Sequence, residues 1–211
     1  MSFKKLLTFT LACLLLSASA FAAENFKVAV GDPEDSEQGV AAKAFKQYVE
    51  EKSNGAVKVD LFFAGALGDE SEAFRNVQKG TLPFAVGGIA NLVPFEKKLG
   101  LLTLPYLFDN LDEVVAGTNG KPAELLNSYA IKAGFRVLTW TYTDFRYISN
   151  SKRPIKKLAD IQGLKFRVPQ SAVLIASYKA FGGSPTPISW AETFTALQQG
   201  VVDGQCYDYS G

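Results

Sequence analysis

The hydrophobic and polar positions of the chain alternate between two periods. Val28 and Val30, and then Val57, Val59 and Leu61, recur every second residue, which is typical of half-buried strands. Between these runs, apolar side chains recur at helical spacing. The pattern predicts five elements: a strand over 26–30, a helix from 35 or 36 to about 53, a strand over 57–62, a helix over 68–80 and an apolar strand over 82–86. This order is typical of an α/β domain with a largely parallel sheet.

The second half of the chain is less regular. Pro105 interrupts the apolar stretch 101–108, which we expect to be a packed loop. A polar, turn-prone connector over 151–154 indicates a second unit that starts near Asn150. The other predicted elements are a helix over 121–134, a strand over 136–142 that 145–148 continues or pairs beside, a strand within 161–169, a helix over 171–181, a loop over 182–187, a helix over 190–199 and a strand over 201–207.

The first residues have the pattern of a secretory signal peptide. Lys4 and Lys5 precede an apolar run over 6–16, which is too short to span ~30 Å of hydrocarbon as a helix. Small residues follow at Ala20 and Ala22, as signal peptidase requires. We expect cleavage after Ala22, which assigns residues 1–22 to the signal peptide, and a periplasmic mature chain. The alternatives are a membrane anchor and lipoprotein cleavage at Cys13.

Composition and charge narrow the function classes. The 211 residues are 47% hydrophobic and 20% charged, which is ordinary for a globular protein. The 22 basic and 21 acidic residues give a net charge of +1, so no global field gathers nucleic acid or an anionic membrane, and we expect neither as a partner. The chain contains no His, which excludes Ser-His-Asp and Cys-His catalysis and most zinc enzymes.

No familiar motif for a cofactor, a metal or a catalytic group occurs in the sequence, and we expect none of the three. The acidic stretch 32–35 lacks the glycine and the distal glutamate of a calcium loop, so we interpret it as a solvated loop. Once Cys13 leaves with the signal peptide, Cys206 has no partner for an intrachain disulfide. Without His it also lacks the usual base of a nucleophile, which favours a buried structural thiol.

Arg167 is the most promising candidate for ligand binding. It lies at the end of a predicted apolar strand, just before Pro169 and a predicted helix start at Ser171. Ligands of α/β sheets bind beyond the carboxyl ends of strands, and a guanidinium presents a planar fork that matches a carboxylate. Spacing alone also allows a surface arginine in an ion pair.

Five short motifs in the right order resemble the DctP family, the periplasmic solute-binding subunits of TRAP transporters. Residues 163–169, GLKFRVP, resemble the family's G-L-K-x-R-V-P signature, and 197–205, LQQGVVDGQ, resemble its A-L-Q-x-G-x-V-D-G-Q stretch. The other motifs lie at 65–70, 104–108 and 183–192. Together the five motifs extend the resemblance over about residues 26–209.

This resemblance implies a fold and a function. The fold is α/β, a two-lobe periplasmic solute-binding protein of the type II-like TRAP class, with a first lobe over 23–145 and a second over 146–211. A small organic acid is captured in the cleft between the lobes and delivered to the TRAP membrane permease subunits. We expect a monomer. The alternatives are an ABC-type periplasmic binding protein and an exported hydrolase that uses carboxylates or Cys206.

The resemblance also implies roles for five residues. Arg167 forms the salt bridge to the ligand's carboxylate, and Arg146 matches a second arginine of the family. Trp190 packs against the ligand, Tyr207 points into the cleft, and Gln170 donates a hydrogen bond. Trp190 and Tyr207 as core aromatics, and Arg146 in a structural ion pair, are the alternatives for these residues.

Two further expectations concern the ligand and the length of the chain. Where some sialic-acid-binding members carry Glu and Arg, this chain has Gly88 and Asn91, which argues against a sialic-acid pocket. The chain stops just after the V-D-G-Q strand, so we expect a C-terminally truncated fragment with an incomplete second lobe. Such a fragment is expected to be poorly stable alone and to bind ligand weakly or not at all.

Overall fold

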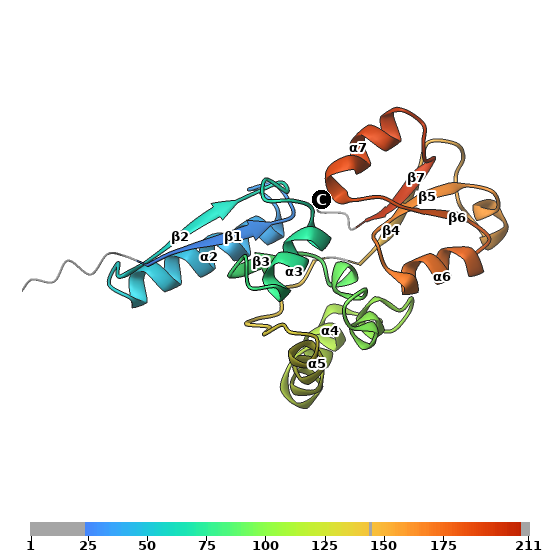
Figure 1. The fold of residues 1–211 in the computed structure, drawn as a ribbon. Coiled ribbons are helices and arrows are strands. Elements are labelled where there is room, and N and C mark those ends of the chain that lie inside the picture. The colour runs from blue at the N-terminus through green and yellow to red at the C-terminus, as the bar shows by residue number, and fades with distance from the viewer. Residues whose placement is uncertain (1–23, 144, 208–211) are drawn as a thin grey trace, which may run out of the picture.

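The protein is built around two separate sheets (Figure 1). The computed structural model describes residues 24–143 and 145–207. Within them, one sheet has three strands in the order β2-β1-β3 and the other has four in the order β4-β7-β5-β6. All pairs are parallel except β4 with β7. The predicted α/β architecture with largely parallel sheets is therefore confirmed.

The first sheet follows the predicted order of elements closely. Its elements are β1 Glu24–Val30, α2 Glu37–Lys52, β2 Val57–Phe62, α3 Glu70–Gln78 and β3 Phe84–Val86. Ser36 caps α2 by accepting a hydrogen bond from the Gly39 amide, and Asp69 caps α3 in the same way from Glu72. The core on one side of this sheet contains the buried side chains of Val28, Val30, Ala42 and Val59.

The middle of the chain departs from the sequence predictions. It forms η1 Ile89–Leu92, η2 Lys97–Thr103, α4 Leu111–Gly117 and α5 Gly120–Lys132. Residues 104–108 form a loop as predicted, whereas 101–103 belong to η2. The loop is not packed as expected, because Tyr106 is 93% exposed.

The predicted strand over 136–142 does not form. Its side chains Val137 and Trp140 pack instead against a core that includes Leu99 and Leu126, and the Thr118 hydroxyl donates to the Tyr142 hydroxyl at 2.9 Å. A run of strand-forming residues without a neighbouring strand has no ladder to join, so packing alone determines its path.

The second sheet carries two helices. Its elements are β4 Tyr147–Asn150, η3 Leu158–Ile161, β5 Lys165–Val168, α6 Ala172–Ala180, β6 Ser184–Pro187, α7 Trp190–Gln198 and β7 Gly204–Tyr207. Phe166 and Val168 of β5 are fully buried in a core with Leu174 and Tyr178. Cys206 is buried in the same core, which confirms the interpretation as a buried thiol.

The predicted loop over 182–187 is wrong, because residues 184–187 form the edge strand β6. The Ser184 and Ile188 amides donate to β5, at 2.8 Å to the Leu164 carbonyl and at 3.1 Å to the Val168 carbonyl. Because successive backbone amides of a strand point in opposite directions, the nitrogens of Pro185 and Pro187 point away from β5. Proline is tolerated in a strand only where no ladder hydrogen bond is needed.

The predicted signal peptide, residues 1–22, lies outside the described residues. Within the described part, no helix is long and apolar enough to cross a membrane.

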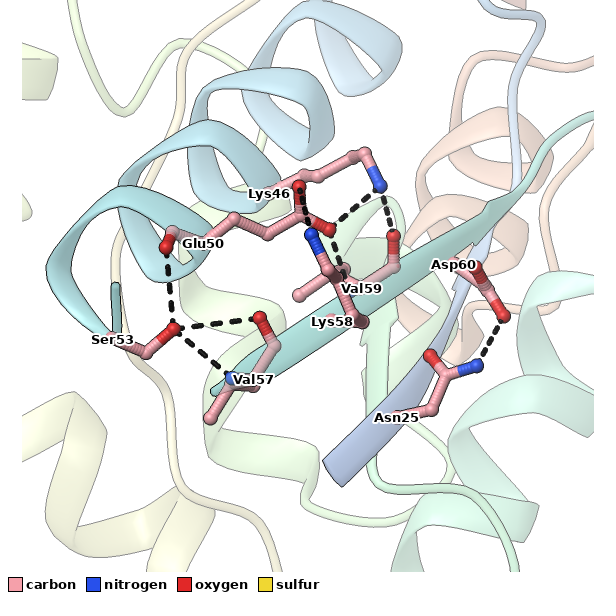
Figure 2. A network of polar contacts seen from close by, with 8 residues as sticks. All are labelled: Asn25, Lys46, Glu50, Ser53, Val57, Lys58, Val59 and Asp60. Atoms are coloured by element: carbon pink, nitrogen blue, oxygen red, sulfur yellow. Dashed lines mark hydrogen bonds and ion pairs between the residues drawn. The ribbon is translucent and has the colours of Figure 1, made fainter. Parts of the chain in front are cut away.

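A polar network joins α2 to the edge strand β2 (Figure 2). The Glu50 carboxylate accepts a hydrogen bond from the Val59 amide at 3.1 Å and forms an ion pair with Lys46 at 3.0 Å. Ser53 accepts from the Val57 amide at 3.1 Å. The hydrogen bond from the Val59 amide has the largest effect on the pKa of Glu50 and the one from Lys46 the next largest. Both hold this pKa below its ordinary value. The ionised form of Glu50 therefore stabilises the fold.

We predict that Glu50→Gln lowers the melting temperature near pH 7 but not near pH 3. Because folding lowers the pKa of Glu50 from 4.5, its stabilisation is present above the unfolded-state pKa and is lost as the pH falls through the folded-state value. Thermal unfolding followed by circular dichroism at both pH values measures the difference. The exposed neighbour Glu51, which pairs with Gln47 on the same helix, gives the control Glu51→Gln. An equal loss at both pH values would contradict the prediction.

The V-D-G-Q motif has a structural explanation. Asp203 accepts from the Lys165 amide at 2.8 Å, and its own amide donates to the Lys165 carbonyl at 2.8 Å, so it pins β7 to β5. Gly204 pairs with Asn150 of β4, and a Cβ on Gly204 would overlap the Ser149 carbonyl oxygen. Only glycine allows this approach of the two strands.

We predict that Gly204→Ala destabilises the protein by about 1–3 kcal/mol, because the added methyl group meets backbone that cannot move aside. Chemical denaturation measures the change. Gly200→Ala is the control for added bulk, since a Cβ there meets no atom, although its positive φ of 70° adds strain. A smaller loss for Gly204→Ala than for Gly200→Ala would contradict this explanation.

A candidate ligand cleft between the two sheets

Arg167 is a buried cation at the carboxyl end of a strand. It lies on β5 between the fully buried Phe166 and Val168, and is itself only 3% exposed. Its Nε donates to the Ile188 carbonyl at 2.9 Å. Among the described residues no carboxylate lies within ion-pair distance of Arg167, so the alternative of a surface salt bridge does not hold.

Burial, and to a smaller extent the nearby positive charge of Arg146, lower the pKa of Arg167 to about 10. The guanidinium still carries its charge at neutral pH. A buried charge without an opposite partner is unfavourable, so an anion that reaches Arg167 recovers part of the cost of burying it. The physical chemistry of this position therefore favours binding of a carboxylate.

One aromatic ring covers the Arg167 guanidinium, and a second ring stacks on the first. Trp190 begins α7, and its ring lies 5.5 Å from the Arg167 guanidinium carbon. The Trp190 ring stacks on Tyr207 with 4.1 Å between centroids and 10° between planes. Both rings remain partly exposed rather than enclosed in a core. A flat face of this kind is suited to contact with a small organic molecule.

Arg146 reaches the same place through the antiparallel pairing of β4 and β7. Tyr147 pairs with Tyr207, which brings the residue before β4 to the end of β7. Arg146 Nη1 donates to the Cys206 carbonyl at 2.9 Å, and its guanidinium carbon lies 5.9 Å from the Tyr207 ring centroid. Arg146, Arg167, Trp190 and Tyr207 thus form one cluster.

Gln170 lies beside this cluster rather than in it. It is exposed, and its side chain makes no hydrogen bond with the described residues. Gln170 lines a small, open hollow between the two sheets. The other lining residues are Asp69, Glu70, Ser71, Asn91, Ser189 and Trp190. The hollow therefore lies between α3 and η1, which are next to the first sheet, and α7, which is next to the second sheet.

Asp32 is a site residue that the sequence interpretation missed. The acidic stretch 32–35 was expected to be a solvated loop, but Asp32 is only 4% exposed. It follows β1, and its carboxylate accepts a hydrogen bond from the Tyr207 hydroxyl at 3.1 Å. Position offers a signal, because Asp32 comes directly after the carboxyl end of a parallel strand, where α/β sheets bind ligands.

Glu70 and Asn91 were also missed as site residues. Glu70 begins α3 and lines the hollow, although an acidic residue in the first turn of a helix is usually explained by the helix dipole. Burial raises the pKa of Glu70, and hydrogen bonds from Gln38 and Gly88 and the charges of Arg167 and Arg146 partly oppose the rise. The spacing from Glu70 to the buried Phe74 is one helical turn, which is the signal that the side chain faces inward.

Within residues 24–143 and 145–207, no three His, Cys, Asp or Glu side chains form a group that could hold a metal ion.

Comparison with known proteins agrees with this architecture. The family model for bacterial extracellular solute-binding proteins of family 7, DctP, matches residues 28–210. A solute-binding protein of Verminephrobacter eiseniae is 40% identical over 191 residues, which cover 89% of this chain and 56% of that protein. The 2,3-diketo-L-gulonate-binding periplasmic protein YiaO of Escherichia coli is 30% identical, over 90% of this chain and 58% of its own length. The chain thus spans less than two thirds of the length of these relatives.

Solved structures show the same fold. A TRAP periplasmic solute-binding protein from Polaromonas with bound D-erythronate is 36% identical, with a TM-score of 0.84 over 87% of this chain and 60% of that one. Another from Sulfurospirillum deleyianum with bound succinate is 30% identical, with a TM-score of 0.84 over 90% and 61%. Since the family model matches most of the chain, the protein belongs to the DctP family of bacterial extracellular solute-binding proteins.

Proposed function

We propose that the protein is the extracytoplasmic solute-binding subunit of a TRAP transporter and captures a small organic acid between its two lobes. The buried Arg167 guanidinium, which has no carboxylate partner among the described residues, carries this proposal. The relatives support it, because the Polaromonas and Sulfurospirillum proteins hold the organic acids D-erythronate and succinate. The family match favours this class over an ABC-type binding protein.

Arg167 binds the ligand's carboxylate, and the aromatic pair of Trp190 and Tyr207 covers the ligand's carbon skeleton. Arg146 adds a second positive charge at the same end of the cleft. Gln170 supplies a hydrogen-bond donor at the rim of the hollow. A charge-assisted hydrogen bond is about twice as strong as a neutral one, so the arginines contribute most of the affinity.

Closure of the two lobes holds the ligand. The lobes comprise residues 23–145 and 146–211, each with its own sheet, and the Tyr207 hydroxyl bridges them by donating to Asp32. The lobes close by a hinge motion, and a ligand that contacts both lobes stabilises the closed arrangement. Binding and closure need no covalent chemistry, so the protein is not an enzyme.

The chain reaches the periplasm by export, with cleavage after Ala22. The closed protein then delivers its acid, as a monomer, to the membrane permease subunits of the transporter. This role needs no cofactor and no metal.

We predict that Arg167→Ala lowers the affinity for organic acids by at least about 30-fold, because it leaves the buried carboxylate of the ligand without its partner. Arg167→Lys keeps the charge but loses the planar fork, so we expect an intermediate loss. Isothermal titration calorimetry with D-erythronate and succinate, on the protein as it is exported, measures both.

The control is Arg136→Ala, which removes an exposed arginine that does not line the hollow. Failure of the complete exported protein to bind any organic acid, or its turnover of an acid, would contradict the proposed function. Unchanged affinity in Arg167→Ala would contradict the role of Arg167 alone.

We also predict that Tyr207→Phe weakens ligand binding by about 2–10-fold. The substitution removes the hydrogen bond to Asp32 while it keeps the ring that stacks on Trp190, so the closed arrangement loses one of its contacts. Calorimetry gives the affinity. Tyr48→Phe, which alters an exposed hydroxyl on α2, is the control. Equal affinities for Tyr207→Phe and wild type would exclude a role for this hydrogen bond in closure.

A further inference from the structure

The Arg146 side chain is a cation on the protein surface. Arg146 directly precedes β4 and is exposed, whereas Arg167 is buried. A long side chain in water samples many rotamers, and ordering it at the moment a ligand binds costs conformational entropy. An exposed arginine therefore contributes more affinity for an acid when other contacts hold it in place beforehand.

The two arginines also repel each other. The positive charge of Arg146 is one of the causes that lower the pKa of Arg167, so the two guanidinium groups are close enough to interact. Arg167 is fixed within the sheet, so the repulsion favours orientations in which the exposed Arg146 turns away into water. A contact that opposes this turn is needed to keep both arginines ready for one carboxylate.

Cys206 offers Arg146 two hydrogen-bond acceptors. Arg146 Nη1 donates to the Cys206 carbonyl oxygen at 2.9 Å and to the Cys206 sulfur at 3.3 Å. Nη1 carries two hydrogens, so it can donate one to each acceptor. One acceptor fixes the distance of the guanidinium from β7, and a second acceptor for the same nitrogen also fixes its direction. Since every residue has a carbonyl, only the sulfur depends on which residue stands at position 206.

The core of the second sheet holds the Cys206 sulfur in place. Cys206 is 2% exposed, pairs with Ile148 of β4 and lies in the same core as Phe166 and Tyr178. Protein cores are close-packed, so a side chain within them keeps its position on the time average. The sulfur therefore links an exposed cation to a rigid part of the fold.

The chemistry of a thiol suits this contact. Its sulfur is a weak, neutral acceptor, so the hydrogen bond orients the guanidinium without neutralising it. The Tyr207 ring, whose centroid lies 5.9 Å from the Arg146 guanidinium carbon, adds a second contact that leaves the charge in place.

We propose that Cys206 is a positioning residue for ligand binding, which acts through Arg146 and does not touch the ligand. Its sulfur holds the Arg146 guanidinium beside Tyr207, in the orientation that receives the ligand's carboxylate. The proposal rests on the function proposed above. It gives the buried thiol a role in binding besides its role in packing.

Three substitutions at Cys206 separate these two roles. Cys206→Ala and Cys206→Val both remove the side-chain acceptor, and valine still fills the core, whereas Cys206→Ser keeps an acceptor. We expect the alanine and valine variants to bind D-erythronate or succinate, whichever the wild type binds more tightly, about 5–20-fold more weakly. The serine variant should stay within about threefold of the wild type. Isothermal titration calorimetry on the complete exported protein gives the affinities, and thermal unfolding followed by circular dichroism gives the stabilities.

Arg146→Ala provides a second readout, because a purely structural role of Cys206 predicts the same loss of affinity with and without Arg146. In the Arg146→Ala background we expect Cys206→Ala to change the affinity by less than about twofold, since the group through which it acts is absent. The matched control is Ile161→Val, which removes a small part of a buried side chain from the same core and no acceptor. It should lower the melting temperature and leave the affinity unchanged.

Wild-type affinity in Cys206→Ala and Cys206→Val, or an equal loss with and without Arg146, would overturn this inference while the proposed function stands. A loss in Cys206→Ser as large as that in Cys206→Ala would overturn it as well. Failure of the wild type to bind any acid from a panel of short mono- and dicarboxylates would overturn the inference together with the proposed function.

Discussion

The cleft depends on one unfavourable arrangement, a guanidinium that is buried at the end of a strand and has no carboxylate partner among the described residues. Phe166 and Val168 on either side of Arg167 point into a packed core, which fixes the strand that carries the arginine. Burying a charge in this way costs free energy, and the favourable packing of the hydrophobic core offsets that cost. Trp190 and the Ile188 carbonyl offset part of this cost. The Arg167 guanidinium is therefore already oriented to bind the carboxylate of an acid.

Local sequence signals predicted most of the helices and strands. The starts of the helices near Ser36 and Asp69 were predicted because a helix cap depends on a side chain and an amide only three residues away. The stretches 136–142 and 184–187 were not, because the presence of a strand depends on whether another strand lies beside it. Residues 136–142 have strand-forming side chains but no such neighbour in the described part of the chain, whereas 184–187 are proline-rich and lie beside β5.

The site residues also divide into those that local sequence signals predicted and those that depend on distant segments. Arg167, Arg146, Trp190 and Tyr207 were found because short motifs mark them, and the structure brings these four together. Asp32 and Glu70 were missed because their surroundings come from distant segments. The environment of Glu70 combines α2, the turn after β1 and the segment after β3, and no local pattern in the sequence contains that combination.

The two prolines of β6 have a consequence for the outer edge of the second sheet. A sheet edge normally exposes amide groups that can pair with a strand of another molecule and start aggregation. On β6 the outward positions are Pro185 and Pro187, which have no amide hydrogen to offer. This edge cannot complete a ladder with a second chain, so the prolines protect the protein from edge-to-edge association while they allow β6 to pair with β5.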